Sequence, residues 1–153
     1  MQDSVTVHVD APPEAVWALV SDVTQIGKYS PETFEAEWLD GATGPVVGAK
    51  FRGHVKRNGR GPVYWAPCTV VVAEPNKEFA FTVGMGSEDK ALNRWGYVLE
   101  PSGEGTDVTE SFLLTPKLAL RVYWALLGWA RGRTNRNGMQ TTLERMKAEL
   151  EGS

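Results

Sequence analysis

A series of six strand-like segments between residues 33 and 114 constrains the fold more than any other feature of this sequence. Lys50–Lys56 alternates strictly, with charged residues and a histidine on one side and apolar or small residues on the other. This period of two residues is typical of a strand with one face in the core. Short turn signals such as Asn58-Gly59 favour antiparallel pairing of neighbours. The predicted strands are Thr33–Leu39, Lys50–Lys56, Val63–Ala73, Glu78–Val83, Ala91–Glu100 and Thr106–Leu114.

The two ends of the chain add one more strand and the helices. Val5–Val9 alternates like a strand, and the Pro12-Pro13-Glu14 run after it favours a helix start, because proline fits the first helical turn. A second short helix is expected at about Val23–Tyr29. Residues Pro116–Leu150 are predicted to form one long helix, or two pieces joined at a kink near three glycines. Its apolar stripe is expected to cover the concave face of the sheet; the stripe is Met139, Leu143, Met146 and Leu150.

The composition of this 153-residue chain excludes several classes of protein. We expect one domain over residues 1–153, since the length suits a single core. The single cysteine, Cys68, cannot form an intramolecular disulfide, and with two histidines it cannot build a zinc cluster. We therefore expect no metal. We also expect no cofactor, because no Gly-rich segment matches a phosphate loop. The N-terminus shows no signal peptide, and Leu118–Ala130 is shorter than the roughly 20 residues of a membrane span, so a cytoplasmic protein is expected.

Several short motifs, in their order along the chain, carry a family resemblance. They are Ala11–Trp17, Tyr29–Glu32, Gly48–Phe51 with Gly53, Trp95–Pro101, Gly105–Thr109 and Met139–Leu143. Together they resemble the START-like, helix-grip superfamily, which includes the polyketide cyclase/dehydrase and lipid-transport proteins, and most of all its small actinobacterial members. The resemblance implies an α+β fold: a seven-stranded antiparallel sheet curved around a long C-terminal helix, with two short helices after the first strand. It also implies a cavity between sheet and helix, but no particular reaction.

The aromatic residues of the chain give the expected cavity its lining. Six Trp, four Tyr and five Phe are many for this length, and most fall on the inward side of a predicted strand or on one face of the terminal helix. A pocket lined in this way suits a flat or extended apolar ligand. The alternative is that the same side chains fill a solid core. The predicted ligand-binding residues are Phe51, Val55, Phe81, Trp95, Tyr97, Glu110, Phe112, Tyr123, Trp124 and Leu127.

Glu110 is the polar residue of most interest, because strand alternation places it with Val108 and Phe112 on the inner side. A buried carboxylate needs a partner or takes up a proton. It could therefore orient a ligand hydroxyl or, with Tyr97 and Tyr123, act as a general acid or base. The alternatives are a bulge that turns Glu110 to solvent or a salt bridge to a base such as Arg94.

The remaining reactive side chains offer little catalytic support. His54 falls on the outer side of its strand among lysines and arginines, and His8 is expected to be solvated. Two unconnected histidines support no Ser/His/Asp arrangement. Cys68 is expected to be a small core residue.

Three functions follow from these observations. The first is binding or transport of a hydrophobic small molecule, lipid- or polyketide-like, without catalysis. The second is a cyclase or dehydratase that uses the polar groups of the cavity. The third is a protein- or RNA-interacting module that uses the basic stretches 50–60 and 117–136, each with five Lys or Arg and no acid. Nucleic acid is the minor hypothesis, because no RNA-binding signature is present.

Overall fold

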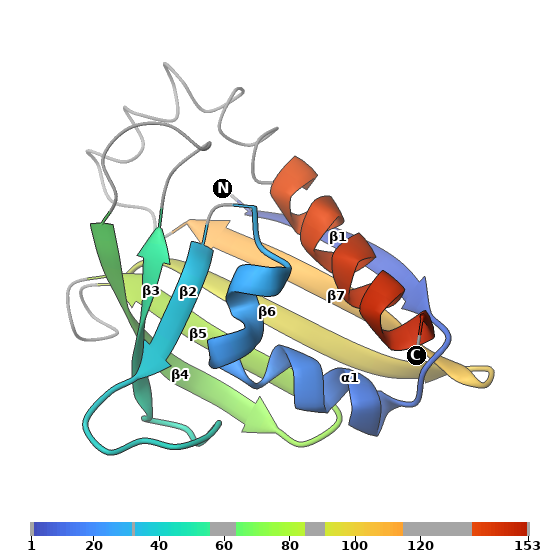
Figure 1. Cartoon of the computed structure of the whole chain (residues 1–153), viewed down its shortest axis with the longest axis horizontal. Helices are drawn as coiled ribbons and strands as arrows, with labels where there is room; N and C mark the ends of the chain where they lie inside the picture. Colours follow the sequence, from blue (N-terminus) through green and yellow to red (C-terminus); the bar gives the residue numbers. More distant parts are fainter. Residues whose placement is uncertain (1, 32, 56–63, 85–90, 115–135, 153) are drawn as a thin grey trace.

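The computed structural model of the chain describes residues 2–31, 33–55, 64–84, 91–114 and 136–152. Within these residues one strand, two short helices, six further strands and a C-terminal helix (residues 136–151) follow one another, which confirms the predicted α+β, helix-grip order (Figure 1). The elements before that helix are β1 (Gln2–Val9), α1 (Pro13–Val20), the 3₁₀ helix η1 (Val23–Lys28), β2 (Thr33–Trp38), β3 (Lys50–Val55), β4 (Tyr64–Glu74), β5 (Glu78–Gly84), β6 (Ala91–Ser102) and β7 (Gly105–Leu114).

The strands form one antiparallel sheet in the order β1-β7-β6-β5-β4-β3-β2. From β2 to β7 each strand pairs with the next along the chain, as the hairpin-like turns predict. β1 pairs with β7, so the two strands joined by α1 and η1 lie at opposite edges of the sheet. Register shifts interrupt the β2–β3, β4–β5 and β5–β6 ladders, and such bulges bend a sheet.

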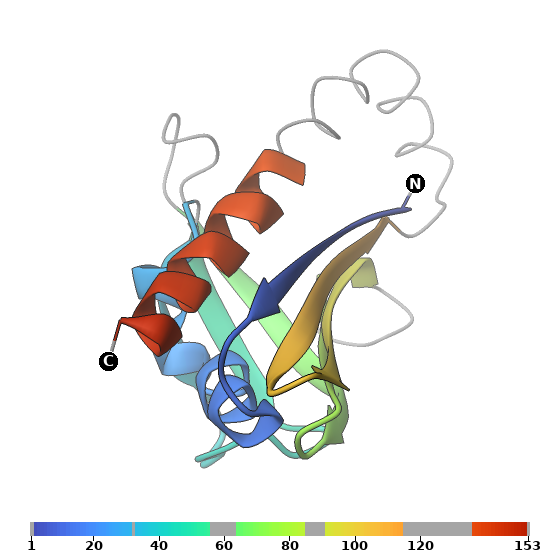
Figure 2. The ribbon, with the colours of Figure 1, turned by 90° about the vertical axis from the view of Figure 1, so that its right-hand side faces the viewer.

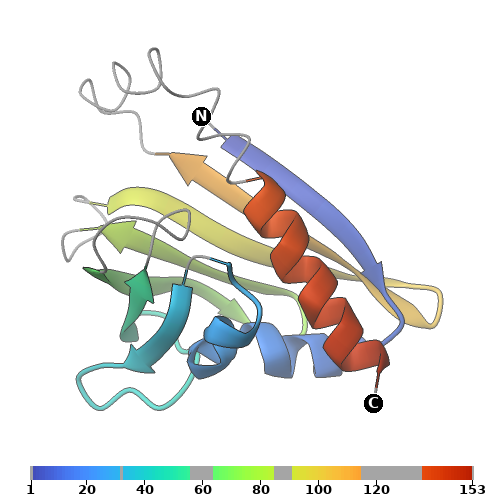
Figure 3. The same ribbon diagram turned by 45° about the horizontal axis from the view of Figure 1, so that its top comes forward.

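The C-terminal helix lies across the concave face of the curved sheet (Figures 2 and 3). Three residues of its predicted apolar stripe are buried: Met139 and Leu143 are 1% exposed and Met146 is 3% exposed. They pack against residues of the sheet, of α1 and of η1. The covered face is therefore the hydrophobic core that the alternation of the strands predicts.

Local sequence signals explain where the short helices begin. Pro13 occupies the first turn of α1, where its missing N–H costs no hydrogen bond. The side chain of Asp22 caps η1 by accepting a hydrogen bond of 3.1 Å from the Thr24 backbone N–H. The apolar residues Val16, Val20 and Val23 of these helices are buried. α1 and η1 thus close the space beside the C-terminal helix.

Two strand details differ from the sequence-based expectation. β1 begins at Gln2, three residues before the predicted Val5, because its ladder with β7 extends to the pair Gln2–Leu113. Because proline has no N–H for a ladder, the sequence indicates a bulge or an edge position at Pro67 of the predicted strand Val63–Ala73; the bulge of β4 lies instead at Val70–Val72. Pro67 faces Arg52 of β3, and the described β4–β5 ladder begins only at Cys68. A residue without an N–H is tolerated where a strand has a partner on one side only.

Other expectations fall on residues outside the described part of the chain. These include residues 116–135 of the predicted long helix and most of the two basic stretches, so whether those stretches form one patch lies outside the described residues. Among the described residues, none of the helices combines the length and apolar character needed to span a bilayer.

Candidate functional site

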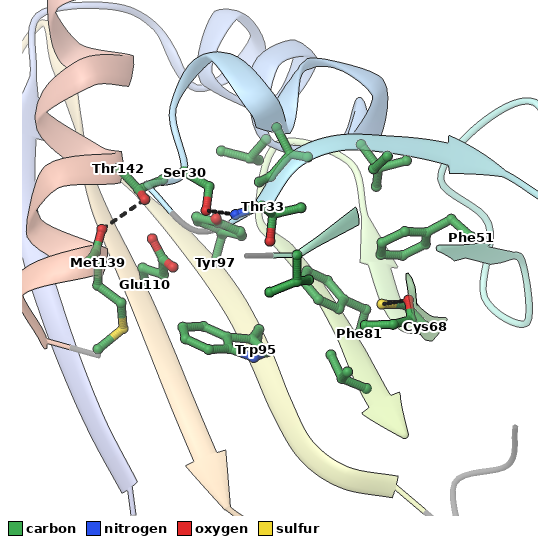
Figure 4. A pocket seen from close by; sticks show the side chains of 18 of the residues that line it. Ser30, Thr33, Phe51, Cys68, Phe81, Trp95, Tyr97, Glu110, Met139 and Thr142 are labelled. Carbon is green, nitrogen blue, oxygen red and sulfur yellow. Dashed lines mark hydrogen bonds between the residues drawn. The ribbon is translucent and has the colours of Figure 1, made fainter. Parts of the chain in front are cut away.

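A cavity of about 150 Å³ lies between the inner face of the sheet, η1 and the C-terminal helix (Figure 4). Phenylalanines form one wall: the ring centroids of Phe51 and Phe81 are 5.1 Å apart, those of Phe79 and Phe81 are 6.0 Å apart, and the first pair meets edge to face. Apolar residues of α1 and η1 add Val20, Val23 and Ile26. The aromatic side chains therefore surround an open space and do not fill it completely.

Six of the predicted ligand-binding residues line this cavity. They are Phe51, Val55, Phe81, Trp95, Tyr97 and Glu110. Phe112 is also buried and lies beside the cavity, where its ring centroid is 4.8 Å from that of Trp95 and it clusters with Met139. Tyr123, Trp124 and Leu127 lie outside the described residues.

The cavity also has lining residues that were not predicted from the sequence. Asn93 lies on the same side of β6 as Trp95 and Tyr97, so strand alternation alone could have identified it. Met139 belongs to the apolar stripe of the terminal helix and could have been found in the same way. In contrast, Ser30 and Pro31 lie in an irregular segment, whose position no periodicity reveals.

Glu110 is buried on β7, the strand next to the edge strand β1, with only 4% of its surface exposed. It lies on β7 between Val5 of β1 and Tyr97 of β6, in ladders without a register shift. Neither sequence-based alternative is found among the residues that the structure describes. The strand has no bulge at Glu110, and Arg94 forms its ion pair with Glu78, at 3.6 Å.

The environment of Glu110 favours the protonated carboxyl group. Burial raises the pKa of Glu110 well above its ordinary value of 4.5, and the hydroxyl of Tyr97 acts in the opposite direction. Burial also raises the pKa of Tyr97, and the neighbouring Glu110 adds to that rise. Within the part of the chain that the structure describes, Glu110 Oε1 is buried and has no hydrogen-bond partner. A buried carboxyl oxygen in this state is available to a bound molecule.

Hydroxyl groups gather at the end of the cavity where Glu110 and Tyr97 lie (Figure 4). Ser30 Oγ accepts a hydrogen bond of 3.0 Å from the backbone N–H of Thr33. Thr142 Oγ1 donates a hydrogen bond of 2.8 Å to the carbonyl of Gly138 in the C-terminal helix. The side chains are thus held in place by the backbone, and this end of the cavity is polar.

The sulfur and the histidines do not add a reactive group to the cavity. Cys68 lines it, but burial raises the pKa of its thiol to about 12, so the thiol stays protonated at neutral pH, as expected for a core residue. His54 lies on the outer face, stacked on Trp65 with a centroid separation of 4.1 Å. His8, which was expected to be solvated, forms a hydrogen bond of 2.7 Å between its Nδ1 and Asp107 Oδ1. No group of His, Cys, Asp and Glu among the described residues is arranged to hold a metal ion.

Comparisons with known proteins agree with this architecture. A family described as polyketide cyclase / dehydrase and lipid transport matches residues 3–151. The chain belongs to this family. The Polyketide_cyc-like protein Cgl2372 from Corynebacterium glutamicum is 32% identical, with 99% of this chain and 94% of that chain covered and a TM-score of 0.63.

More distant structures share the fold of this family member. The protein TTHA0849 from Thermus thermophilus has a TM-score of 0.71 at 17% identity, over 99% of this chain and 98% of that chain. The protein Ms6760 from Mycobacterium smegmatis has a TM-score of 0.68 at 18% identity, over 99% of this chain and 91% of that chain. The search of curated proteins found no match.

Proposed function

We propose that this family member binds a small, mostly apolar molecule in the cavity between the sheet and the C-terminal helix, and carries it without transforming it. The observation that carries this proposal is the aromatic cavity of about 150 Å³, into which faces a buried carboxyl oxygen that has no partner among the described residues. A cavity of this size holds a ligand of about one aromatic ring. The family description, which includes lipid transport, supports the same class of ligand.

The chemistry of the lining favours carriage over catalysis. The described lining contains one carboxyl group, one tyrosine hydroxyl and one protonated thiol, and no histidine, lysine or arginine. General acid–base catalysis is usually performed by groups whose pKa lies near the working pH, and it needs a second group in position. The apolar wall, in contrast, contributes about 25 cal/mol for each Å² of ligand surface that it removes from water.

Binding can be tested by titrating the isotope-labelled protein with p-xylene, an apolar probe, and measuring the NMR chemical shifts of the protein. We expect saturable shifts at cavity residues. Ala66→Phe, which places a ring in the cavity, is expected to weaken binding at least about tenfold, since it competes for the same volume. Thr82→Phe adds the same ring on the outer face of β5 and serves as the matched control.

Extraction of the freshly purified protein with organic solvent, followed by mass spectrometry, identifies any molecule that it retains. A compound that is present in wild type and in Thr82→Phe, but absent from Ala66→Phe, supports carriage in the cavity. Unchanged p-xylene shifts in Ala66→Phe, together with extracts free of any compound, would contradict the proposal.

A second function, an enzyme of the cyclase or dehydratase type, is favoured by one observation: Glu110 and Tyr97 are adjacent, buried and both raised in pKa. A protonated Glu110 could donate a proton to a ligand oxygen. If the extracted compound changes mass on incubation with the protein, Glu110→Gln should abolish that change while Cys68→Ser retains it. An unchanged compound would leave binding as the function, and equal turnover in Glu110→Gln would show that catalysis does not depend on Glu110.

A further inference from the structure

The cavity contains a second polar atom in the same condition as Glu110 Oε1. Asn93 Oδ1 is buried and, among the residues that the structure describes, has no hydrogen-bond partner. Both side chains line the same cavity. Leaving a buried polar atom without a partner costs about 1–3 kcal/mol, so two such atoms facing one space indicate two contacts that a ligand makes.

The sheet register places these two residues far apart along the cavity. Glu110 pairs with Tyr97 on β6, and Asn93 lies four residues before Tyr97 on the same strand. Four strand residues span about 13 Å. Trp95 lies between the two positions, and its partner on β5 is Phe81. The cavity is therefore polar at each end and aromatic in the middle.

We infer that the ligand is a neutral molecule with an aromatic or similarly flat centre and a hydroxyl group at each end, one bound by Glu110 and the other by Asn93. This inference rests on the proposed function, because it specifies the ligand of that cavity. Because the two residues are about 13 Å apart along the sheet, the two ligand hydroxyls must be well separated and not adjacent. No Lys, Arg or His is present in the described lining to balance an anionic end.

A hydroxyl group suits both ends for the same reason. It can donate to a carboxylate or an amide oxygen, and it can accept from a protonated carboxyl or an amide N–H. A ligand with only one polar end leaves the other buried oxygen without a partner. A site that hydrogen-bonds a ligand hydroxyl discriminates against the analogue that lacks it, because its own polar group is then left unpaired.

The test uses two isomers with the same atoms and different spacing. In para-benzenedimethanol the hydroxyls lie at opposite ends of one ring, and in ortho-benzenedimethanol they lie side by side. NMR titrations of the wild-type protein with both isomers and with p-xylene give the affinities. We expect the para isomer to bind about tenfold more tightly than the ortho isomer, which corresponds to one hydrogen bond to a buried group.

Asn93→Leu removes the amide while keeping a similar volume. The ratio of the affinities for the para and ortho isomers should therefore fall to about one. The matched control is Arg94→Leu, the adjacent residue of β6, whose side chain forms an ion pair with Glu78; it should retain the preference. If Asn93→Leu does not fold, the three ligands on the wild-type protein still decide the question.

The outcomes separate this inference from the proposed function. Equal affinity for the two isomers, with p-xylene bound, overturns the two-ended ligand and leaves the apolar binding site intact. Failure of all three compounds to bind overturns both. A preference that persists in Asn93→Leu overturns the role of Asn93.

Discussion

Glu110 shows how a single buried polar residue can lower the stability of a fold. It occupies a fully paired position of the sheet, where an apolar residue would satisfy every packing requirement. Instead, a carboxyl group is buried with one oxygen unpartnered among the described residues. Strand alternation was sufficient to predict that Glu110 faces inward. That Arg94 forms its ion pair with Glu78 and not with Glu110 was not predictable, because the register decides which side chains of neighbouring strands meet.

Replacing Glu110 by Gln should stabilise the protein at neutral pH. The pKa of Glu110 is raised in the folded state, so at pH 7 the buried group must stay protonated or carry an unbalanced charge, whereas the unfolded chain ionises it freely. We expect a gain of about 1–3 kcal/mol in the free energy of unfolding, because Gln does not ionise in the unfolded chain and each unit of pKa difference is worth about 1.4 kcal/mol. Urea unfolding at pH 7 measures it. Glu100→Gln, at an exposed position of β6, is the control and should change little; a less stable Glu110→Gln protein would contradict the argument.

The C-terminal helix is the element that closes the cavity over the concave face of the sheet. Its buried stripe covers the concave face of the sheet, and two residues of the helix, Met139 and Thr142, line the cavity. Its first turn is tied to β1, since the guanidinium group of Arg136 donates hydrogen bonds of 2.8 and 3.0 Å to the carboxylate of Asp3. At the other end, Lys147 donates a hydrogen bond of 2.8 Å to the carbonyl of His8. Both ties join the helix to the same edge strand.

Truncating this stripe should destabilise the protein strongly. Leu143 is 1% exposed, and Leu143→Ala removes buried methyl groups and leaves a void that close packing cannot fill. We expect a loss of about 2–5 kcal/mol in the free energy of unfolding. Glu144→Ala, one residue along and exposed on the same helix, should cost less than about 0.5 kcal/mol. Equal effects of the two substitutions in chemical denaturation would mean that the helix is not packed as described.

The whole molecule combines titrating groups with opposite effects on stability. The pKa of Asp3 is lowered by its hydrogen bond to Arg136, and that of Glu151 is lowered by the backbone N–H of Asp10 and by Lys147. These groups stabilise the fold above their ordinary values of 3.8 and 4.5, and the contribution is lost as the pH falls. The pKa of His8 is raised by its hydrogen bond to Asp107, so its contribution is present below 6.5 and is lost as the pH rises.

We therefore expect the thermal unfolding midpoint to be highest in mildly acidic solution. The alkaline fall combines His8 with Glu110, whose raised pKa makes the fold lose stability as the pH increases above 4.5. The double variant His8→Gln/Glu110→Gln should flatten the alkaline side, and Asp3→Asn should flatten part of the acid side. Scanning calorimetry between pH 3 and about pH 9 checks both. A wild-type midpoint that rises steadily to alkaline pH would contradict the assignment.

The sequence by itself determined the order of elements, the inward side of most strands and the apolar stripe of the terminal helix, because periods of 2 and 3.6 residues are local properties of the chain. It also placed Phe51, Phe81, Trp95, Tyr97 and Glu110 at one interior face. Only the tertiary structure decided that this interior retains a cavity, since that depends on how far η1 and the terminal helix stand from a sheet bent by bulges. The unpartnered oxygens of Glu110 and Asn93 were decided at the same level, because register sets which side chains can meet.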